Sequence, residues 1–166
     1  MQAPSRLSVA YLASLLLLIL LGMGCKNQYL VGYMDTETFA ARCKWRHTLD
    51  YDYKPRFPEY VDSLRALPDS FSATIVLGTW CNDSRKWVRR FFALRQAMPL
   101  REVEIVAVDT TKRDERGYYQ RYNYDSIPVF IFRREAEIGR IYVKPVRPRR
   151  SIERDIYRIV KPGGTH

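Results

Sequence analysis

Cysteine and histidine are scarce in this sequence. Only 3 cysteines and 2 histidines occur among its 166 residues. Three cysteines are too few for a disulfide-rich scaffold or for a zinc site built from four cysteines. Neither His47 nor His166 lies in a cluster of cysteines and carboxylates with the spacing of metal ligands. We therefore expect no metal ion and no cofactor.

Long apolar runs, internal repeats and low-complexity segments are also lacking. The one extended apolar run, residues 9–21, would form a helix of roughly 20 Å, shorter than the roughly 30 Å hydrocarbon core of a bilayer. A run of this length, preceded by the single charge of Arg6, is typical of a secretory signal peptide. We therefore expect residues 1–24 to form an export signal.

Small residues and a cysteine follow the apolar run, in the order Gly22, Gly24 and Cys25. This order resembles a bacterial lipoprotein signal, in which a cysteine after a small residue is lipidated and becomes the new amino terminus. Two alternatives stay open: a membrane-tethered helix, and a signal that is cleaved without lipidation of Cys25. The resemblance implies a lipid-anchored protein on the periplasmic side of a bacterial membrane.

Acidic residues are outnumbered by basic ones. The chain has 28 Lys and Arg against 18 Asp and Glu, which gives a formal net charge of +10. An exported chain does not meet the chromosome and the sequence has no recognisable nucleic-acid-binding module, so we expect no nucleic-acid partner. The basic surface, including a cluster at residues 144–150, is better matched to anionic lipid or acidic partners.

The rest of the chain has the composition of one globular domain, with 46% hydrophobic and 28% charged residues. Residues 25–57 have no clear period and are expected to form a tether and an amino-terminal extension. Residues 58–166 alternate between helical and strand patterns. Helices are expected at 58–67, 84–98, 117–122 and 151–160, and strands at 73–77, 103–108, 129–132 and 138–143. The order predicts an α/β fold with a mixed sheet of about four strands and helices on both faces.

The most informative segment is Thr79–Ser84, which lies between an expected strand and an expected helix. The Cys81 thiol would lie near the first turn of that helix, where unpaired N–H groups and the helix dipole favour the thiolate. The thiolate is the form that attacks a disulfide. The negative charge of Asp83 acts in the opposite sense. Asp83 and Ser84 are both candidates for capping the helix.

Three motifs in this order resemble the thioredoxin-like superfamily. Trp80-Cys81 lies at the strand-to-helix turn, as in the W-C-x-x-C motif of that family. Residues 126–132 are similar to its proline loop and following strand, and residues 137–141 to its final hairpin strand. The sequence is most similar to bacterial, often lipid-anchored members with a W-C-x-D-S motif. Here that motif consists of Trp80, Cys81, Asn82, Asp83 and Ser84.

The resemblance implies a thioredoxin-like fold with a cis peptide between Ile127 and Pro128, opposite Cys81. It also implies that the loop at Ile127 and Pro128 docks an extended substrate peptide by strand-like pairing. The alternative is a proline that simply begins a strand.

Two departures from the family pattern affect the release of a bound substrate. Ser84 stands in place of the second cysteine, so Cys81 cannot form a disulfide within the motif. Ile75 stands where the family often has a buried carboxylate, six residues before the first cysteine. Cys43 is then the remaining candidate for a resolving thiol or for a bridge to Cys81, and the alternative is an ordinary buried or surface cysteine.

Two functions therefore stay open. The first is a monothiol oxidoreductase, a reductase or isomerase in which Cys81 attacks a disulfide or sulfenic acid of a protein, and Cys43 or an external thiol releases it. The second is a non-catalytic module that binds peptides or proteins, because a fold alone does not fix a function.

Overall fold

The computed structural model describes residues 29–45, 51–112, 117–143 and 151–163. The predictions for the export signal, for Cys25, for His47 and His166 and for the basic cluster at 144–150 lie outside these residues. In the described ranges, no helix has the length and apolar character needed to cross a membrane.

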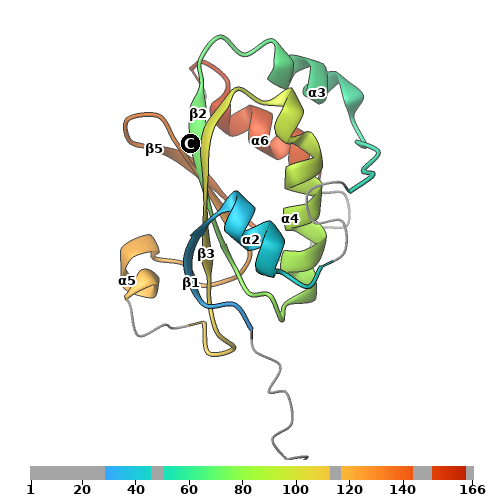
Figure 1. Ribbon diagram of the computed structural model, residues 1–166. Coiled ribbons are helices and arrows are strands. Elements are labelled where there is room, and N and C mark those ends of the chain that lie inside the picture. The colour runs from blue at the N-terminus through green and yellow to red at the C-terminus, as the bar shows by residue number, and fades with distance from the viewer. Residues whose placement is uncertain (1–28, 46–50, 113–116, 144–150, 164–166) are drawn as a thin grey trace, which may run out of the picture.

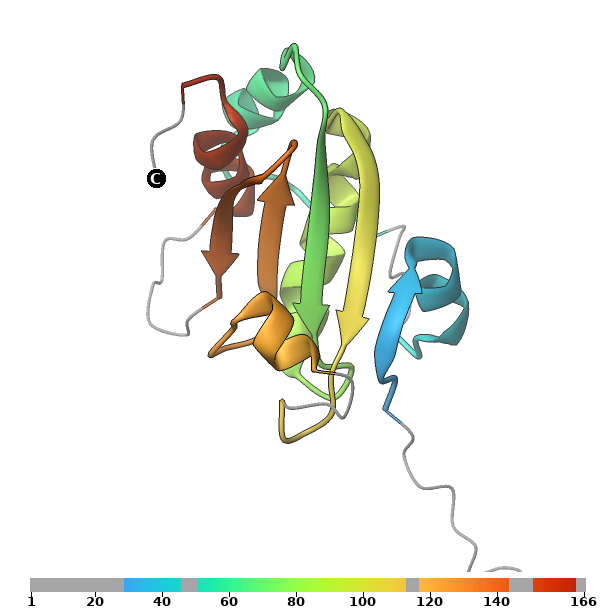
Figure 2. The same ribbon diagram turned by 90° about the vertical axis from the view of Figure 1, so that its left-hand side faces the viewer.

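A mixed sheet of five strands forms the centre of the protein, which confirms the α/β class (Figure 2). Its strands run in the order β1-β3-β2-β4-β5. β2 and β3 are parallel, and the other neighbours are antiparallel, so the expected parallel pair and hairpin are both present. The strands are β1 (Gly32–Asp35), β2 (Phe71–Leu77), β3 (Leu100–Ala107), β4 (Val129–Arg133) and β5 (Glu137–Tyr142).

The prediction of about four strands was wrong, because part of the expected tether belongs to the sheet. β1 pairs with β3 at one edge, and helix α2 (Thr36–Arg42) follows it directly. Asp35 caps α2 by accepting a hydrogen bond from the Thr38 N–H at 2.6 Å, and its bonds to Thr38 lower the pKa of Asp35. A strand of 4 residues and a helix of 7 are too short to give a recognisable period.

Helices cover both faces of the sheet, as predicted (Figure 1). Of the helices in the described residues, α5 (Tyr118–Tyr122) is the one that lies on the first face. Side chains of β2 alternate accordingly, since Ile75 belongs to the large core under the other helices and Val76 to the smaller core under α5. The helices of the larger layer are α2, α3 (Pro58–Arg65), α4 (Asn82–Leu94) and α6 (Ile152–Val160).

The expected helix at 84–98 differs from the structure at both ends. α4 begins two residues earlier, at Asn82, and ends at Leu94, where the short 3-10 helix η1 (Arg95–Ala97) follows. At α6 the prediction was accurate, because Ser151 caps it by accepting a hydrogen bond from the Arg154 N–H at 3.2 Å.

Aromatic packing fixes α4 against the sheet. Phe91 of α4 is fully buried, and its ring stacks on Phe130 of β4 with 5.3 Å between centroids. Burial of a phenylalanine contributes about 1.5–3 kcal/mol, and an aromatic pair adds about 0.5–1.5 kcal/mol. α4 is thereby held so that its first turn lies at the end of β2.

Candidate functional site at the Cys81 turn

The chain passes from β2 to α4 through a tight turn at Gly78–Cys81, called here the Cys81 turn. The Cys81 N–H donates to the Gly78 carbonyl at 3.0 Å, and the Arg85 N–H donates to the Cys81 carbonyl at 3.0 Å. Cys81 is therefore the N-cap residue of a helix of 13 residues. Within the described structure its side chain makes no capping hydrogen bond, and the residue is half-buried. The thiol thus lies at the positive end of a helix dipole.

Ser84 and Asp83 do not cap α4, contrary to expectation. The cap position is occupied by Cys81, and the Ser84 hydroxyl instead accepts a hydrogen bond from the Gly78 N–H at 3.2 Å. Ser84 is fully buried. The residue in the place of a second motif cysteine therefore fastens the turn and is closed off from solvent.

Gly78 is needed because two side chains close over it. A Cβ atom at this position would lie 2.7 Å from Cε2 of Trp80 and 2.9 Å from Cδ1 of Ile127. Real Cβ atoms essentially never approach other atoms so closely. The absence of a side chain at Gly78 thus leaves room for the Trp80 indole and the Ile127 side chain to close over the turn.

Three long-range hydrogen bonds hold the turn in place. The Thr79 hydroxyl accepts from the Leu30 N–H at 3.1 Å, and the Thr79 carbonyl accepts from Nε1 of Trp45 at 3.1 Å. Nε1 of Trp80 donates to the Val108 carbonyl at 3.2 Å. Leu30, Trp45 and Val108 were not predicted as site residues. A tryptophan in an otherwise irregular segment was the only sequence signal for any of them.

The peptide bond between Ile127 and Pro128 is cis, which confirms the prediction. Ile127 belongs to the smaller core, and Trp80 and Cys81 pack against that same core. The structure therefore brings together three of the residues singled out in the sequence, from two segments more than forty positions apart. Asn82 is exposed and Asp83 half-buried in the first turn of α4.

Cys43 lies in a different environment from Cys81. It is buried in the large core on the helical side of the sheet, whereas Cys81 packs against the core under α5. Among the residues that the structure describes, no disulfide joins the two thiols. Trp45, two positions after Cys43, donates a hydrogen bond to the Thr79 carbonyl of the Cys81 turn.

Basic residues on α4 follow two patterns. Arg85 and Lys86 are exposed, as expected for a solvated face. Arg89 lies over the Tyr51 ring at 4.1 Å, and Arg90 lies over Tyr53 at 5.2 Å. The half-buried arginines therefore cover the segment before α3, as cation–π partners, and do not point to the thiol.

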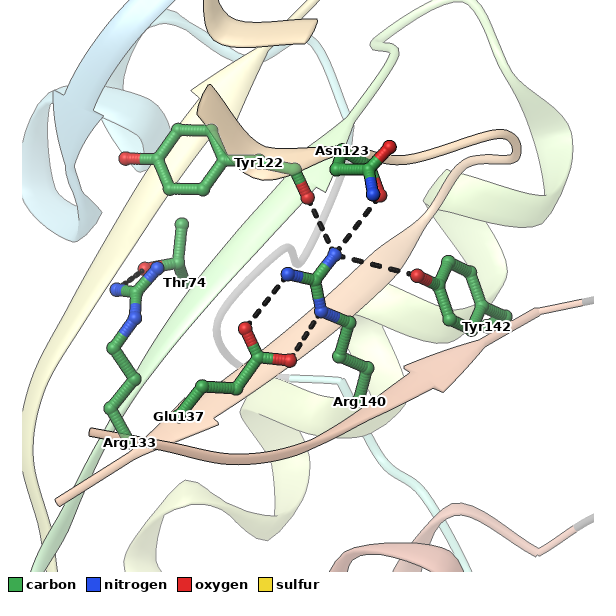
Figure 3. A network of polar contacts seen from close by, with 7 residues as sticks. All are labelled: Thr74, Tyr122, Asn123, Arg133, Glu137, Arg140 and Tyr142. Carbon is green, nitrogen blue, oxygen red and sulfur yellow. Dashed lines mark hydrogen bonds and ion pairs between the residues drawn. The ribbon is translucent and has the colours of Figure 1, made fainter. Parts of the chain in front are cut away.

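A separate polar network fastens α5 to the sheet (Figure 3). Arg140 pairs with Glu137 and donates to the carbonyls of Tyr122 at 2.5 Å and Asn123 at 3.0 Å. The Glu137 carboxylate raises the pKa of Arg140. The arginine thereby ties the carboxyl end of α5 to β5.

A row of polar side chains continues this network across the sheet. Arg133 of β4 donates to the Thr74 hydroxyl at 2.6 Å, and Thr74 donates to Glu104 at 2.8 Å (Figure 3 shows the first of these bonds). Glu104 also accepts from the Tyr33 hydroxyl, and burial together with this carboxylate raises the pKa of Tyr33 to about 12. Because these groups satisfy one another, we assign them a structural role.

No group of three or more His, Cys, Asp or Glu side chains in the described segments could hold a metal ion.

Comparison with known proteins extends to the fold only. No family model and no curated protein matches the sequence. The chain is similar to the crystal structure of a protein of unknown function from Pseudomonas aeruginosa, with 18% identity and a TM-score of 0.50 over 70% of this chain and 74% of the other. An HIV epitope scaffold has 18% identity and a TM-score of 0.49 over 69% of this chain and 74% of its own.

Proposed function

We propose that the protein is a thioredoxin-like monothiol oxidoreductase that acts on protein disulfides or sulfenic acids through Cys81. The observation that carries the proposal is the position of this thiol. Cys81 begins α4 and packs, with Trp80, against the core that contains Ile127 of the cis-proline loop. The sulfur is partly exposed at the start of a helix, where a substrate sulfur can reach it.

The topology supports assignment to the thioredoxin-like superfamily. In chain order, α4 lies between the parallel strands β2 and β3, and the hairpin of β4 and β5 is followed by the terminal helix α6. The cis proline directly precedes β4, as the resemblance to the family implies. At the edge of the sheet opposite β5, β1 pairs antiparallel with β3, and α2 follows it.

The proposed reaction is one thiol–disulfide exchange followed by a second. The Cys81 thiolate attacks one sulfur of the substrate disulfide, the new S–S bond forms, and the other substrate sulfur leaves as a thiolate that takes up a proton. With a sulfenic acid, the same attack gives the mixed disulfide and releases water. A second thiolate then attacks the substrate sulfur of the mixed disulfide, the S–S bond to Cys81 breaks, Cys81 leaves as its thiolate, and the substrate sulfur stays bonded to the attacking thiol.

The resolving thiol is proposed to come from outside the chain. Ser84 cannot supply it, since a hydroxyl forms no disulfide and this one is buried against Gly78. Cys43 is buried in the opposite core. An external low-molecular-weight or protein thiol needs access only to the half-buried Cys81.

A second candidate function, a non-catalytic module that binds peptides, is favoured by one observation. Ile75, in the position of the family's buried carboxylate, is fully enclosed in the apolar core. Among the described residues, Ser84 therefore supplies no second thiol and Ile75 supplies no carboxylate to accept its proton. This is what we expect of a fold that only binds its partner.

We further propose that the protein works on the periplasmic side of a bacterial membrane, anchored by lipid at Cys25. The apolar run at residues 9–21 and the small residues before Cys25 support this. The mass of the mature protein tests it: a chain that begins at Cys25 and carries acyl groups is expected. An unmodified chain beginning elsewhere would contradict the anchor.

Trapping of mixed disulfides in native membranes tests the proposed reaction. Full-length protein should form adducts with other proteins that disappear on reduction and in the Cys81→Ser variant. Cys43→Ala serves as the matched control and should keep the adducts. Adducts that persist in Cys81→Ser would show that this thiol is not the attacking group. Partners retained without any adduct would favour the binding module.

A further inference from the structure

Exposed apolar side chains are concentrated at the start of the described chain. Tyr29, Val31 and Tyr33 are the exposed large hydrophobic side chains in the described residues, at 43%, 44% and 49% of their full accessibility. Between and after them, Leu30 and Met34 pack against the large core. Along the chain the three exposed side chains alternate with the half-buried Leu30 and the buried Gly32. We call them the Tyr29 stripe.

The Tyr29 stripe lies beside the Cys81 turn. The Leu30 N–H donates to the Thr79 hydroxyl, two residues before Cys81. Gly32 of β1 and Leu77 of β2 pair with the same residue, Ala107 of β3. The start of β1 and the end of β2 therefore lie at one end of the sheet (Figure 2). We call this the site end.

The chain reaches the site end directly from its proposed anchor. Cys25 precedes Tyr29 by four positions in the sequence. Four residues span at most about 15 Å even when fully extended. An anchor at Cys25 therefore cannot separate the Tyr29 stripe from the lipid headgroups by more than this length.

Charge at the site end suits an anionic surface. Lys44, next to the Trp45 that bonds the turn, is exposed, as are Arg85 and Lys86 in α4. Two acidic groups at this end, Asp83 and Asp109, are half-buried, and a third, Asp125 beside the cis-proline loop, is exposed. Basic side chains are attracted to anionic headgroups, and tyrosine rings are enriched at the boundary between lipid and water.

We propose that the Tyr29 stripe rests on the lipid headgroups of an anionic membrane and that the Cys81 turn faces that membrane. The orientation follows from the stripe, the short link to Cys25 and the bond between Leu30 and Thr79. Its consequence for substrates rests on the proposed function. The partners of Cys81 are then proteins whose disulfide or sulfenic acid lies close to the membrane surface.

Quenching by labelled lipids tests this orientation in the full-length chain. The protein is reconstituted into vesicles of phosphatidylethanolamine and phosphatidylglycerol that carry a nitroxide on the headgroup. A fluorophore is attached to Cys81 in one sample. In the other it is attached at Ser70→Cys in a Cys81→Ser background. Ser70 is exposed just before β2, whose 7 residues separate the two positions by about 23 Å.

The Cys81 probe should be quenched at least twofold more than the probe at position 70. The double variant Tyr29→Ser with Val31→Ser should reduce this ratio toward one. Vesicles that lack phosphatidylglycerol should also give a smaller ratio. The control Glu135→Ser with Ala136→Ser changes two exposed residues in the turn between β4 and β5, at the opposite end, and should leave the ratio unchanged.

Equal quenching of the two probes, or stronger quenching at position 70, would overturn the orientation. So would a ratio that is unaffected by the double variant, since the anchor alone would then explain the proximity. The trapping experiment in native membranes is independent of this result. Strong Cys81 quenching without any mixed disulfide would reject the proposed reaction and leave the membrane-facing orientation standing. Mixed disulfides without stronger quenching of the Cys81 probe would support the reaction and reject the orientation.

Discussion

Replacement of Gly78 by alanine tests how tightly the Cys81 turn is built. The added Cβ would lie 2.7 Å and 2.8 Å from two atoms of the Trp80 indole and 2.9 Å from Cδ1 of Ile127. Gly78 has no left-handed backbone angle, so the backbone itself accepts alanine. The destabilising part of the effect therefore comes from these contacts.

The expected loss of stability can be worked out from two opposing terms. Overpacking of a closed site costs about 1–3 kcal/mol, and the lower entropy of the unfolded chain returns about 0.4–1 kcal/mol. Gly78→Ala should thus lower the free energy of unfolding by at most about 2.6 kcal/mol, and by about 1.3 kcal/mol at the centre of these ranges. The displaced indole should also lose its hydrogen bond to Val108, which changes the fluorescence of Trp80.

Urea unfolding of the detergent-solubilised full chain measures this loss. Ile127→Val removes the Cδ1 atom that the new Cβ would meet, so the double variant should lose less stability than the two single variants together. Gly117→Ala is the control, because its Cβ meets only Gln120 at 3.7 Å while its φ of +74° disfavours alanine. It should destabilise without changing Trp80. A Gly78→Ala variant as stable as the parent, with unaltered Trp80 fluorescence, would show that Trp80 and Ile127 do not close tightly over Gly78.

Three further predictions concern the surroundings of the site. Glu153 is fully buried and accepts hydrogen bonds from the Tyr53 hydroxyl and the Phe57 N–H, so Glu153→Ala should cost about 2–4 kcal/mol in urea unfolding, whereas exposed Glu59→Ala should cost little. Burial and Glu153 raise the pKa of Tyr53 from 10.0 to about 12. The folded state thus favours its protonated form, and this stabilisation is complete below pH 10 and lost as the pH rises to about 12. Tyr53→Phe should abolish that part of the pH dependence of the urea midpoint, and an unchanged profile would contradict the assignment. Trp45→Phe removes one hydrogen bond to the turn, so it should lower the free energy of unfolding by about 1 kcal/mol. It should also speed hydrogen exchange at the Cys81 N–H. Unaltered exchange there would argue against a role of Trp45 in fixing the turn.

Local patterns predicted most of the fold. Apolar runs such as the one ending at Leu77 and the periodic apolar face around Phe91 identify β2 and α4 without tertiary information. The same holds for α6, where Ser151 is a good cap in any context. β1 escaped prediction because its stability comes from pairing with β3, a partner about seventy residues away. Four residues hold too little periodic information to reveal such a strand.

The position of Cys81 at a helix start could be predicted from the sequence. The hydrogen bonds that hold the Cys81 turn in place could not. The order Trp80, Cys81 and a following amphipathic face placed the thiol at a helix start. The expected caps failed because Cys81 itself takes the cap position and turns Ser84 inward to Gly78. The bond from Trp45 to the turn joins positions 34 residues apart, and no local pattern encodes it.

The reactivity of the Cys81 thiol tests the central proposal most directly. The full-length protein is exposed at neutral pH to a small aromatic disulfide, and modification of each cysteine is followed over time by peptide mass analysis, in the folded state and in urea. We expect Cys81 to react faster in the folded protein than in the unfolded chain, although folding half-buries it. A Cys81 that reacts more slowly when folded would contradict an attacking role for this thiol.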